Sequence, residues 1–239
     1  MSDQLAGLRA DSLAATGSPA LLVIDVQRDF ADPALLASWG VDEAGLRSVA
    51  DAISRTAALV DAARAADVPV VWVELAYDPS RPWRASAWLR TGSPDSPTGD
   101  FPCVQGTAGA EWWGLAPLPT ELRVRKRFYS GFAGTGLAAV LDELGTGWLA
   151  VTGLTTECCV LATVTDAAQH DYPVVVARDA TAAYTAELHE SALANMALNS
   201  ADVRSAEEIE GLWAAIGLGS GTGFGSGTGT GSGSAEVAS

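Results

Sequence analysis

The chain has 239 residues, of which 48% are hydrophobic and 18% charged, so it carries enough apolar material for a sizeable core. Its formal net charge of −15 repels phosphate backbones and anionic lipid, which argues against nucleic acid and membrane partners. No apolar stretch is long enough for a transmembrane helix, and the N-terminus lacks the pattern of a secretory signal. Three cysteines are too few for a disulfide framework, so we expect a reduced, cytoplasmic protein.

Composition divides the chain into three segments. Residues 1–18 form a polar leader, residues 19–216 form one folded domain, and residues 217–239 form a tail in which glycine alternates with other residues as far as position 233. Alternating glycine cannot bury a core and loses much backbone entropy on ordering, so we expect this tail to be disordered.

Within the domain, short apolar runs rich in β-branched residues alternate with amphipathic segments. In chain order, the predicted elements are a strand at 20–26, a helix at 44–66, strands at 68–76 and 122–128, a helix at 135–145, a strand at 147–153, a helix at 159–171, a strand at 172–180, a helix at 187–199 and a short edge strand opening 201–209. Apolar strands separated by helices indicate a parallel sheet covered on both faces. The predicted fold is therefore a three-layer α/β/α domain with a mainly parallel, doubly wound sheet.

Ligands of such sheets bind beyond the carboxyl ends of the strands, so chemically active residues at those ends are the candidates. They are Asp25, Glu74, Lys126, the turn 153–159 and Asp179. Lys126 is the only lysine in a chain that otherwise carries its positive charge on arginine, and a compact ammonium is not interchangeable with a guanidinium.

Cys158 and Cys159 lie in the turn that follows the strand at 147–153. Neighbouring residues on a helix point about 100° apart, so we expect only one of the two thiols to face the cleft. A thiol at a helix start gains thiolate character, and a nearby ammonium would lower its pKa further. Asp25, Lys126 and Cys159 could then converge, with the carboxylate taking the thiol proton and the sulfur attacking a carbonyl carbon.

Several motifs in order along residues 19–205 resemble those of the isochorismatase-like cysteine hydrolases. They are LLVIDVQRDF (21–30), KRFYSGF (126–132), GTGLAAVL (134–141), VTGLTTECCVLATVTDA (151–167), YPVVVARDATAAY (172–184) and LHESALANM (188–196). This family includes nicotinamidases, N-carbamoylsarcosine amidases, biuret hydrolases, ureidoacrylate amidohydrolases and isochorismatases. The resemblance implies a catalytic triad of Asp25, Lys126 and Cys159, because the family's spacing from Gly153 selects the second cysteine.

The resemblance also implies how the turn would work. A cis peptide bond between Leu154 and Thr155 would aim the Thr155 N–H, together with the Cys159 N–H, at the oxygen of the reacting carbonyl. Gln27 would order the loop beside the aspartate or contact the substrate. The family further implies a small-molecule amide substrate and a homodimeric or homotetrameric assembly.

The segment after the second strand departs from the metal-binding pattern of nicotinamidases. Residues 74–83 contain no histidine, and the two histidines of the chain, His170 and His189, are predicted to be surface residues on helices far downstream. We therefore expect neither a metal nor another cofactor. Aromatic residues of the insertion at 77–119 suit a flat or apolar substrate, and Tyr77, Trp83 and Trp88 are the candidate contacts.

Four functions are compatible with these patterns. The first is a cysteine-dependent hydrolase that cleaves an amide, carbamoyl, ureido or lactam C–N bond through an acyl-enzyme. The second is an isochorismatase-type vinyl ether hydrolase, although such enzymes often lack the cysteine. The third is a dinucleotide-binding oxidoreductase, supported only by the loose match of GTGLAA (134–139) to GxGxxA. The fourth is an inactive binding protein on the same fold.

Overall fold

The computed structural model describes residues 13, 15–80 and 101–219. Trp83 and Trp88, most of the expected leader and residues 220–239 of the expected tail lie outside the described residues. Within the described ranges, no helix has the length and apolar character that crossing a membrane requires.

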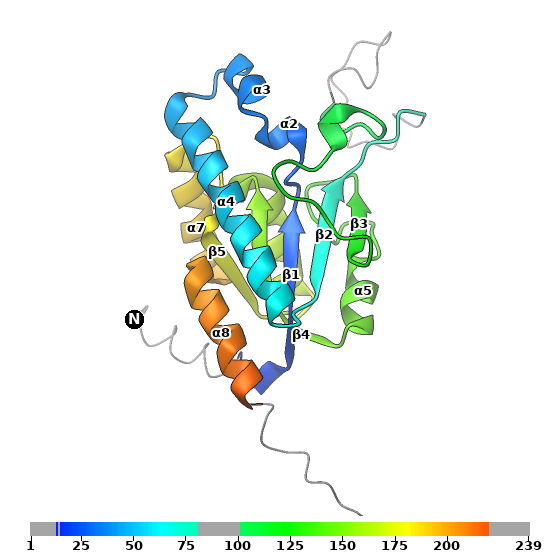
Figure 1. Cartoon of the computed structure of the whole chain (residues 1–239), viewed down its shortest axis with the longest axis vertical. Coiled ribbons are helices and arrows are strands. Elements are labelled where there is room, and N and C mark those ends of the chain that lie inside the picture. Colours follow the sequence, from blue (N-terminus) through cyan, green and yellow to red (C-terminus); the bar gives the residue numbers. More distant parts are fainter. Residues whose placement is uncertain (1–12, 14, 81–100, 220–239) are drawn as a thin grey trace, which may run out of the picture.

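A six-stranded, entirely parallel sheet forms the centre of the fold (Figure 1). Its strands are β1 (Ser18–Ile24), β2 (Val70–Leu75), β3 (Leu122–Lys126), β4 (Thr146–Leu154), β5 (Val174–Ala182) and β6 (Asp202–Arg204). They lie in the order β3-β2-β1-β4-β5-β6. The chain therefore winds outward from β1 in one direction and then from β4 in the other. This arrangement confirms the predicted doubly wound sheet, including the short edge strand.

Helices cover both faces of the sheet, which completes the three predicted layers (Figure 1). One face carries α4 (Glu43–Ala65) and α8 (Ala206–Gly219). The other face carries α5 (Leu137–Glu143), α6 (Leu161–Gln169) and α7 (Ala186–Asn199). Because side chains alternate between faces along each strand, the buried strands supply apolar residues to both layers, which is why they read as continuous hydrophobic runs.

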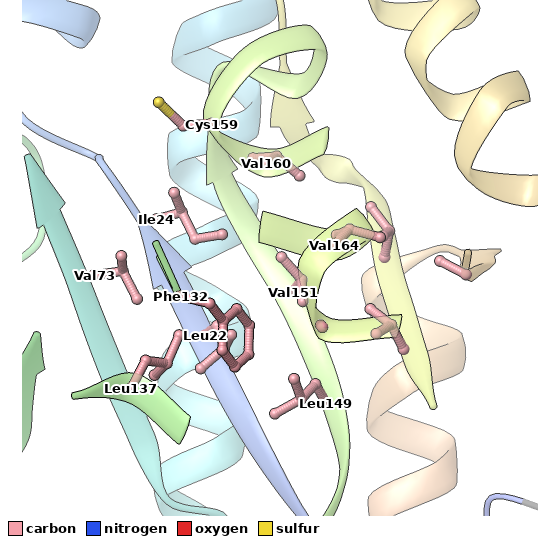
Figure 2. Close-up of a cluster of buried hydrophobic side chains, with 14 of the residues drawn as sticks. Leu22, Ile24, Val73, Phe132, Leu137, Leu149, Val151, Cys159, Val160 and Val164 are labelled. Carbon is pink, nitrogen blue, oxygen red and sulfur yellow. The ribbon is translucent and has the colours of Figure 1, made fainter. Parts of the chain in front are cut away.

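The core beneath α5, α6 and α7 leads directly to the carboxyl end of the sheet. It includes Leu22 and Ile24 of β1, Val73 of β2 and Val151 of β4. Figure 2 shows Cys159 at the end of this cluster, beyond Ile24 and Val73, with its sulfur directed away from the aliphatic side chains. The packed core thus fixes the base of the candidate site.

Some elements differ from those predicted. Two short helices, α2 (Arg28–Ala31) and α3 (Pro33–Ser38), follow β1 where no element was expected. Helix α8 runs to Gly219, three residues beyond the expected domain boundary, and buries Ile209 and Trp213. Leu13, assigned to the leader, is also buried in the core.

Candidate active site

The three candidate catalytic residues come from strands on both sides of the point where the winding reverses. β1 pairs with β2 on one side and with β4 on the other. Asp25 directly follows β1, Cys159 lies in the turn after β4, and Lys126 is the last residue of β3. Crevices form at such switch points because the flanking connections lead to opposite faces of the sheet. The topology therefore brings together residues that are more than 130 positions apart in sequence.

Asp25 is held rigidly by the main chain. Its φ of 49° places it in the left-handed region, which aspartate tolerates better than most residues. Its N–H donates to the carbonyl of Val73 at 2.9 Å, and its Oδ1 accepts from the N–H of Leu75 at 2.8 Å. The carboxylate is completely buried, so these contacts and a neighbouring cation replace the water it has lost.

Lys126 links the aspartate to the cysteine. Its Nζ lies 2.6 Å from Oδ2 of Asp25 and 3.3 Å from Sγ of Cys159. A third contact, 3.1 Å to the carbonyl of Phe128, uses the remaining direction of the ammonium. The lysine is only 2% exposed, so three partners satisfy a charge that solvent does not reach. The ammonium therefore lies between a carboxylate and a thiol and contacts both.

The turn that carries Cys159 is a single π-helical turn, Thr156–Val160, set between β4 and α6. The N–H groups of Cys158 and Val160 both donate to the Thr155 carbonyl at 3.2 Å. The peptide bond between Leu154 and Thr155 is cis. Together these features place the main chain of Thr155 and the side chain of Cys159 on the same short loop.

Gly153 is required where this loop leaves β4. Its φ of 123° is rarely adopted by residues with a side chain. A Cβ added there would overlap the carbonyl oxygen of Ile24 on the neighbouring strand. The glycine therefore allows β1 and β4 to approach closely just before Asp25 and the turn that carries Cys159.

Burial and neighbouring charges shift the pKa values of Asp25 and Lys126. Burial raises the pKa of Asp25, although Lys126 and a hydrogen bond with Cys159 act against this. Burial lowers the pKa of Lys126, but the charges of Asp25 and Cys159 outweigh it, and the net pKa is raised. Both directions favour a charged ammonium beside a carboxylate whose affinity for a proton is increased.

The thiol of Cys159 does not have the lowered pKa that its place near a helix start led us to expect. Its interaction with Cys158, followed by burial and the charge of Asp25, raises its pKa well above the usual range, and Lys126 only partly opposes this. The same interaction lowers the pKa of Cys158. This direction favours the protonated thiol, so a base would have to take its proton to generate a thiolate.

The candidate substrate contacts have different surroundings. The amide of Gln27 bonds the main chain of Leu75 and Ala110, so it orders the loop beside Asp25 rather than offering its amide to a ligand. The hydroxyl of Tyr77 is buried and has no hydrogen-bond partner among the described residues. Burial raises the pKa of Tyr77, and the neighbouring Tyr129, Cys159 and Asp25 act in the same direction.

The other acids at predicted strand ends lie away from the triad. Glu74 is buried within β2 and forms ion pairs with Arg123 and Arg125 at 2.6 and 2.8 Å. Asp179 lies inside β5 rather than at its end, and its Oδ1 accepts from the N–H of Ala206 at the start of α8. Both residues support the fold instead of the reaction.

Of the two histidines predicted to lie at the surface, His170 is exposed as expected. The ring of His170 stacks on Phe132, with centroids 4.7 Å apart. His189 is half-buried, and its Nδ1 lies 2.8 Å from Oγ1 of Thr156, so the prediction of a surface residue was wrong. Within the described ranges, no group of three or more His, Cys, Asp or Glu side chains could hold a metal ion.

Comparison with known proteins identifies relatives along most of the chain. Residues 19–208 match the family model of the isochorismatase domain. A ureidoacrylate amidohydrolase, RutB, from Methylobacterium radiotolerans is 35% identical over 194 residues, which cover 74% of this chain and 72% of that protein. A protein described as a probable inactive nicotinamidase from Arabidopsis thaliana is 33% identical over 180 residues, covering 74% and 87%. The crystal structure of a cysteine hydrolase from Pseudomonas syringae pv. phaseolicola superposes with a TM-score of 0.68 at 26% identity, covering 83% of this chain and 93% of that one.

Proposed function

Because the chain belongs to the isochorismatase family, we propose that it is a cysteine-dependent hydrolase that cleaves a C–N bond of a small amide, ureido or lactam compound. Hydrolysis of an amide-type bond is the activity named for the ureidoacrylate amidohydrolase relative. One observation carries the cysteine mechanism. The buried ammonium of Lys126 contacts the carboxylate of Asp25 and the sulfur of Cys159 at the same time.

The reaction begins with proton transfer from Cys159 to Asp25. As the thiol proton moves to the carboxylate, the sulfur forms a bond to the substrate carbonyl carbon, and the π electrons of the carbonyl move to its oxygen. The raised pKa of Asp25 favours this transfer, because a base with greater proton affinity takes the thiol proton more readily. Lys126 keeps its charge throughout and balances the negative charge shared by the two groups.

The oxygen that becomes negative would be stabilised by the N–H groups of Thr155 and Cys159. Loss of one such donor typically costs about 10²–10³ in rate, so the placement of this loop matters as much as the nucleophile. The intermediate then breaks its C–N bond while the proton on Asp25 passes to the departing nitrogen. The products of this half-reaction are the free amine, or ammonia, and a thioester on Cys159.

Water completes the cycle. Asp25, again a carboxylate, takes a proton from water as the oxygen attacks the thioester carbon. The C–S bond then breaks, the sulfur regains a proton, and a carboxylic or carbamic acid leaves. The same carboxylate therefore serves as base, acid and base in turn, which requires its direct contact with the thiol.

Tyr77 is the side chain best placed to select the substrate. It follows β2 two residues after Leu75, whose N–H binds Asp25, and its buried hydroxyl lacks a partner among the described residues, so a substrate polar group that forms a hydrogen bond with it would satisfy it. The oxygen of a tyrosine hydroxyl can also accept, and a ureido compound offers a second N–H group next to the scissile bond, which makes this class the first to test. We also propose a homodimeric or homotetrameric assembly.

A release assay tests this function. The purified chain should release ammonia or amine from at least one member of a panel of ureido acids, carbamoyl compounds, linear amides and lactams. Intact-mass spectrometry under acid quench should show an acyl adduct that Cys159→Ala cannot form. Isochorismate belongs in the same panel, because turnover of isochorismate alone would instead indicate a vinyl ether hydrolase. No turnover of any compound by a folded chain would support an inactive protein.

A further inference from the structure

His189 contacts the turn that carries Cys159 from α7, a helix that follows later in the sequence and packs against this turn. It lies in the first turn of α7, where its N–H donates to the carbonyl of Thr185 at 3.2 Å. Its ring contacts Thr156 through the 2.8 Å interaction between Nδ1 and Oγ1. Thr156 is completely buried, so water cannot replace the ring as a partner for the hydroxyl. No step of the proposed reaction uses this histidine.

Thr156 sits at the centre of the geometry that the reaction needs. It is joined to Thr155, whose N–H is the proposed oxyanion donor, and it opens the π turn that carries Cys159. The Thr155 carbonyl is already bound by two N–H groups of the turn, and the Thr155 hydroxyl donates to Glu157 at 3.0 Å. These contacts all lie within the turn, whereas the contact to His189 ties the turn to a separate element of the fold.

Burial lowers the pKa of His189, so its ring is neutral at physiological pH. A neutral ring with its proton on Nε2 accepts a hydrogen bond from the Thr156 hydroxyl through Nδ1. That bond fixes the side-chain rotamer of Thr156 and, through it, limits rotation of the adjoining main chain. A polar contact of this kind is directional, which apolar packing of the same volume is not.

We propose that His189 is a positioning residue that anchors the nucleophile turn through Thr156 and so holds the oxyanion donors in place. The catalytic part of this inference rests on the proposed function, but the anchoring of the turn does not. His189 contacts the hydroxyl of Thr156 rather than the sulfur of Cys159. It acts by reducing the freedom of the loop on which both groups are carried.

Substitutions at both ends of the hydrogen bond test this inference. His189→Leu removes the ring nitrogen at similar volume, and Thr156→Val removes the hydroxyl from an isosteric side chain. His189→Asn and Thr156→Ser are the conservative counterparts, because the Asn amide oxygen can occupy the position of Nδ1 and Ser retains the hydroxyl. His170→Leu is the matched control, since the ring of this other histidine stacks on Phe132 instead.

The first measurement needs no substrate. Hydrogen exchange by mass spectrometry should show faster exchange in the peptide spanning 154–160 for His189→Leu and Thr156→Val, with near wild-type exchange for the two conservative variants. The double variant should exchange no faster than His189→Leu, because that substitution already removes the contact with Thr156 as well as a hydrogen bond to the main chain of Arg178. Unchanged exchange in this peptide would overturn the inference, even if the melting temperature falls.

The second measurement uses the amide identified by the release assay. His189→Leu should lower kcat at least about tenfold, a smaller loss than the 10²–10³ of deleting an oxyanion donor outright, while KM changes little. His189→Asn should restore most of the rate, and His170→Leu should leave it unchanged. Faster exchange with an unaltered kcat would overturn the catalytic part of the inference. If the wild-type chain hydrolyses no amide, the proposed function fails, and the exchange data still decide whether His189 anchors the turn.

Discussion

The ammonium of Lys126 and the carboxylate of Asp25 lie 2.6 Å apart, and neither side chain is exposed to solvent. Removing one partner of a buried pair leaves the other uncompensated, which typically costs about 3–5 kcal/mol of folding free energy. A buried pair is therefore a structural liability unless it has another use. In the proposed reaction, contact with the thiol of Cys159 gives the pair such a use.

Lys126→Ala and Lys126→Arg should both lower kcat by at least about 10²-fold, the lower end for losing a positioned catalytic group. Arginine keeps the charge, but its planar fork cannot replace a compact ammonium that contacts a carboxylate, a sulfur and a carbonyl. Steady-state kinetics would measure the loss, and thermal unfolding would separate it from a folding defect. Arg127→Ala is the control, since this neighbouring cation is exposed and should be dispensable. A fully active Lys126→Arg variant would show that only charge matters at this position.

Cys159, not Cys158, should be essential for turnover. Cys159→Ala should abolish activity, because its sulfur is the one that contacts Lys126, and Cys158→Ala should retain most of it. Alkylation alone cannot identify the nucleophile, since Cys158 is the more exposed thiol and its pKa is lowered by its interaction with Cys159. The acyl adduct should therefore be located by peptide mapping. An adduct on Cys158 would contradict the assignment.

Removing Cys158 should also change the acidity of its neighbour. The interaction between the two thiols is the largest cause of the raised pKa of Cys159, so Cys158→Ala should lower that pKa. The pH dependence of alkylation in the Cys158→Ala variant, compared with the Cys158→Ser variant, would report the shift. Both variants lack the thiol of Cys158. If the pKa of Cys159 is the same in both and still lies above 9.0, burial rather than the neighbouring thiol is the main cause of its raised pKa.

Exhaustive chelation should leave turnover unchanged. The segment 74–83 offers no histidine, and the two histidines of the chain are engaged by Phe132 and Thr156. Activity would be measured after dialysis against EDTA and after treatment with a stronger zinc chelator, with residual metal determined by mass spectrometry. Activity that is lost on chelation and regained with zinc would contradict this expectation.

The sequence predicts the order of the strands along the chain and the meeting of the three candidate catalytic residues, but not every element or contact around them. Continuous apolar runs mark the buried parallel strands, and because such strands end at one edge, Asp25, Lys126 and Cys159 could be expected to meet. Helix α8 was missed because glycine interrupts its pattern, although Trp213 and Ile209 anchor it in the core. The contacts of Trp213 and Ile209 with the sheet form only in the folded chain, and local sequence does not encode them.

No sequence motif marks the residues whose contacts hold the candidate site in place. Leu75 contributes an N–H to Asp25 from the neighbouring strand, which any residue except proline could do. Thr156 and His189 are 33 positions apart, and only the packing of α7 against the turn brings them together. The pKa of Cys159 was mispredicted for the same reason. Burial and its neighbours outweigh the helix start, and burial is a property of the folded chain.

The pH dependence of kcat/KM should reveal Asp25 as the base. The enzyme needs this carboxylate ionised, so the rate should rise as pH increases through the pKa of Asp25 in the free enzyme. Burial raises that pKa above 3.8, so the acidic limb should have its midpoint above this value.

Because a hydrogen bond with Cys159 lowers the pKa of Asp25, Cys159→Ala should raise the pKa of Asp25 further. Infrared difference spectra of the buried carboxyl group, assigned with Asp25→Asn, would follow that shift without turnover, and circular dichroism would exclude acid unfolding. A limb at or below 3.8, or a carboxyl signal that Cys159→Ala leaves in place, would show that Asp25 does not receive the thiol proton.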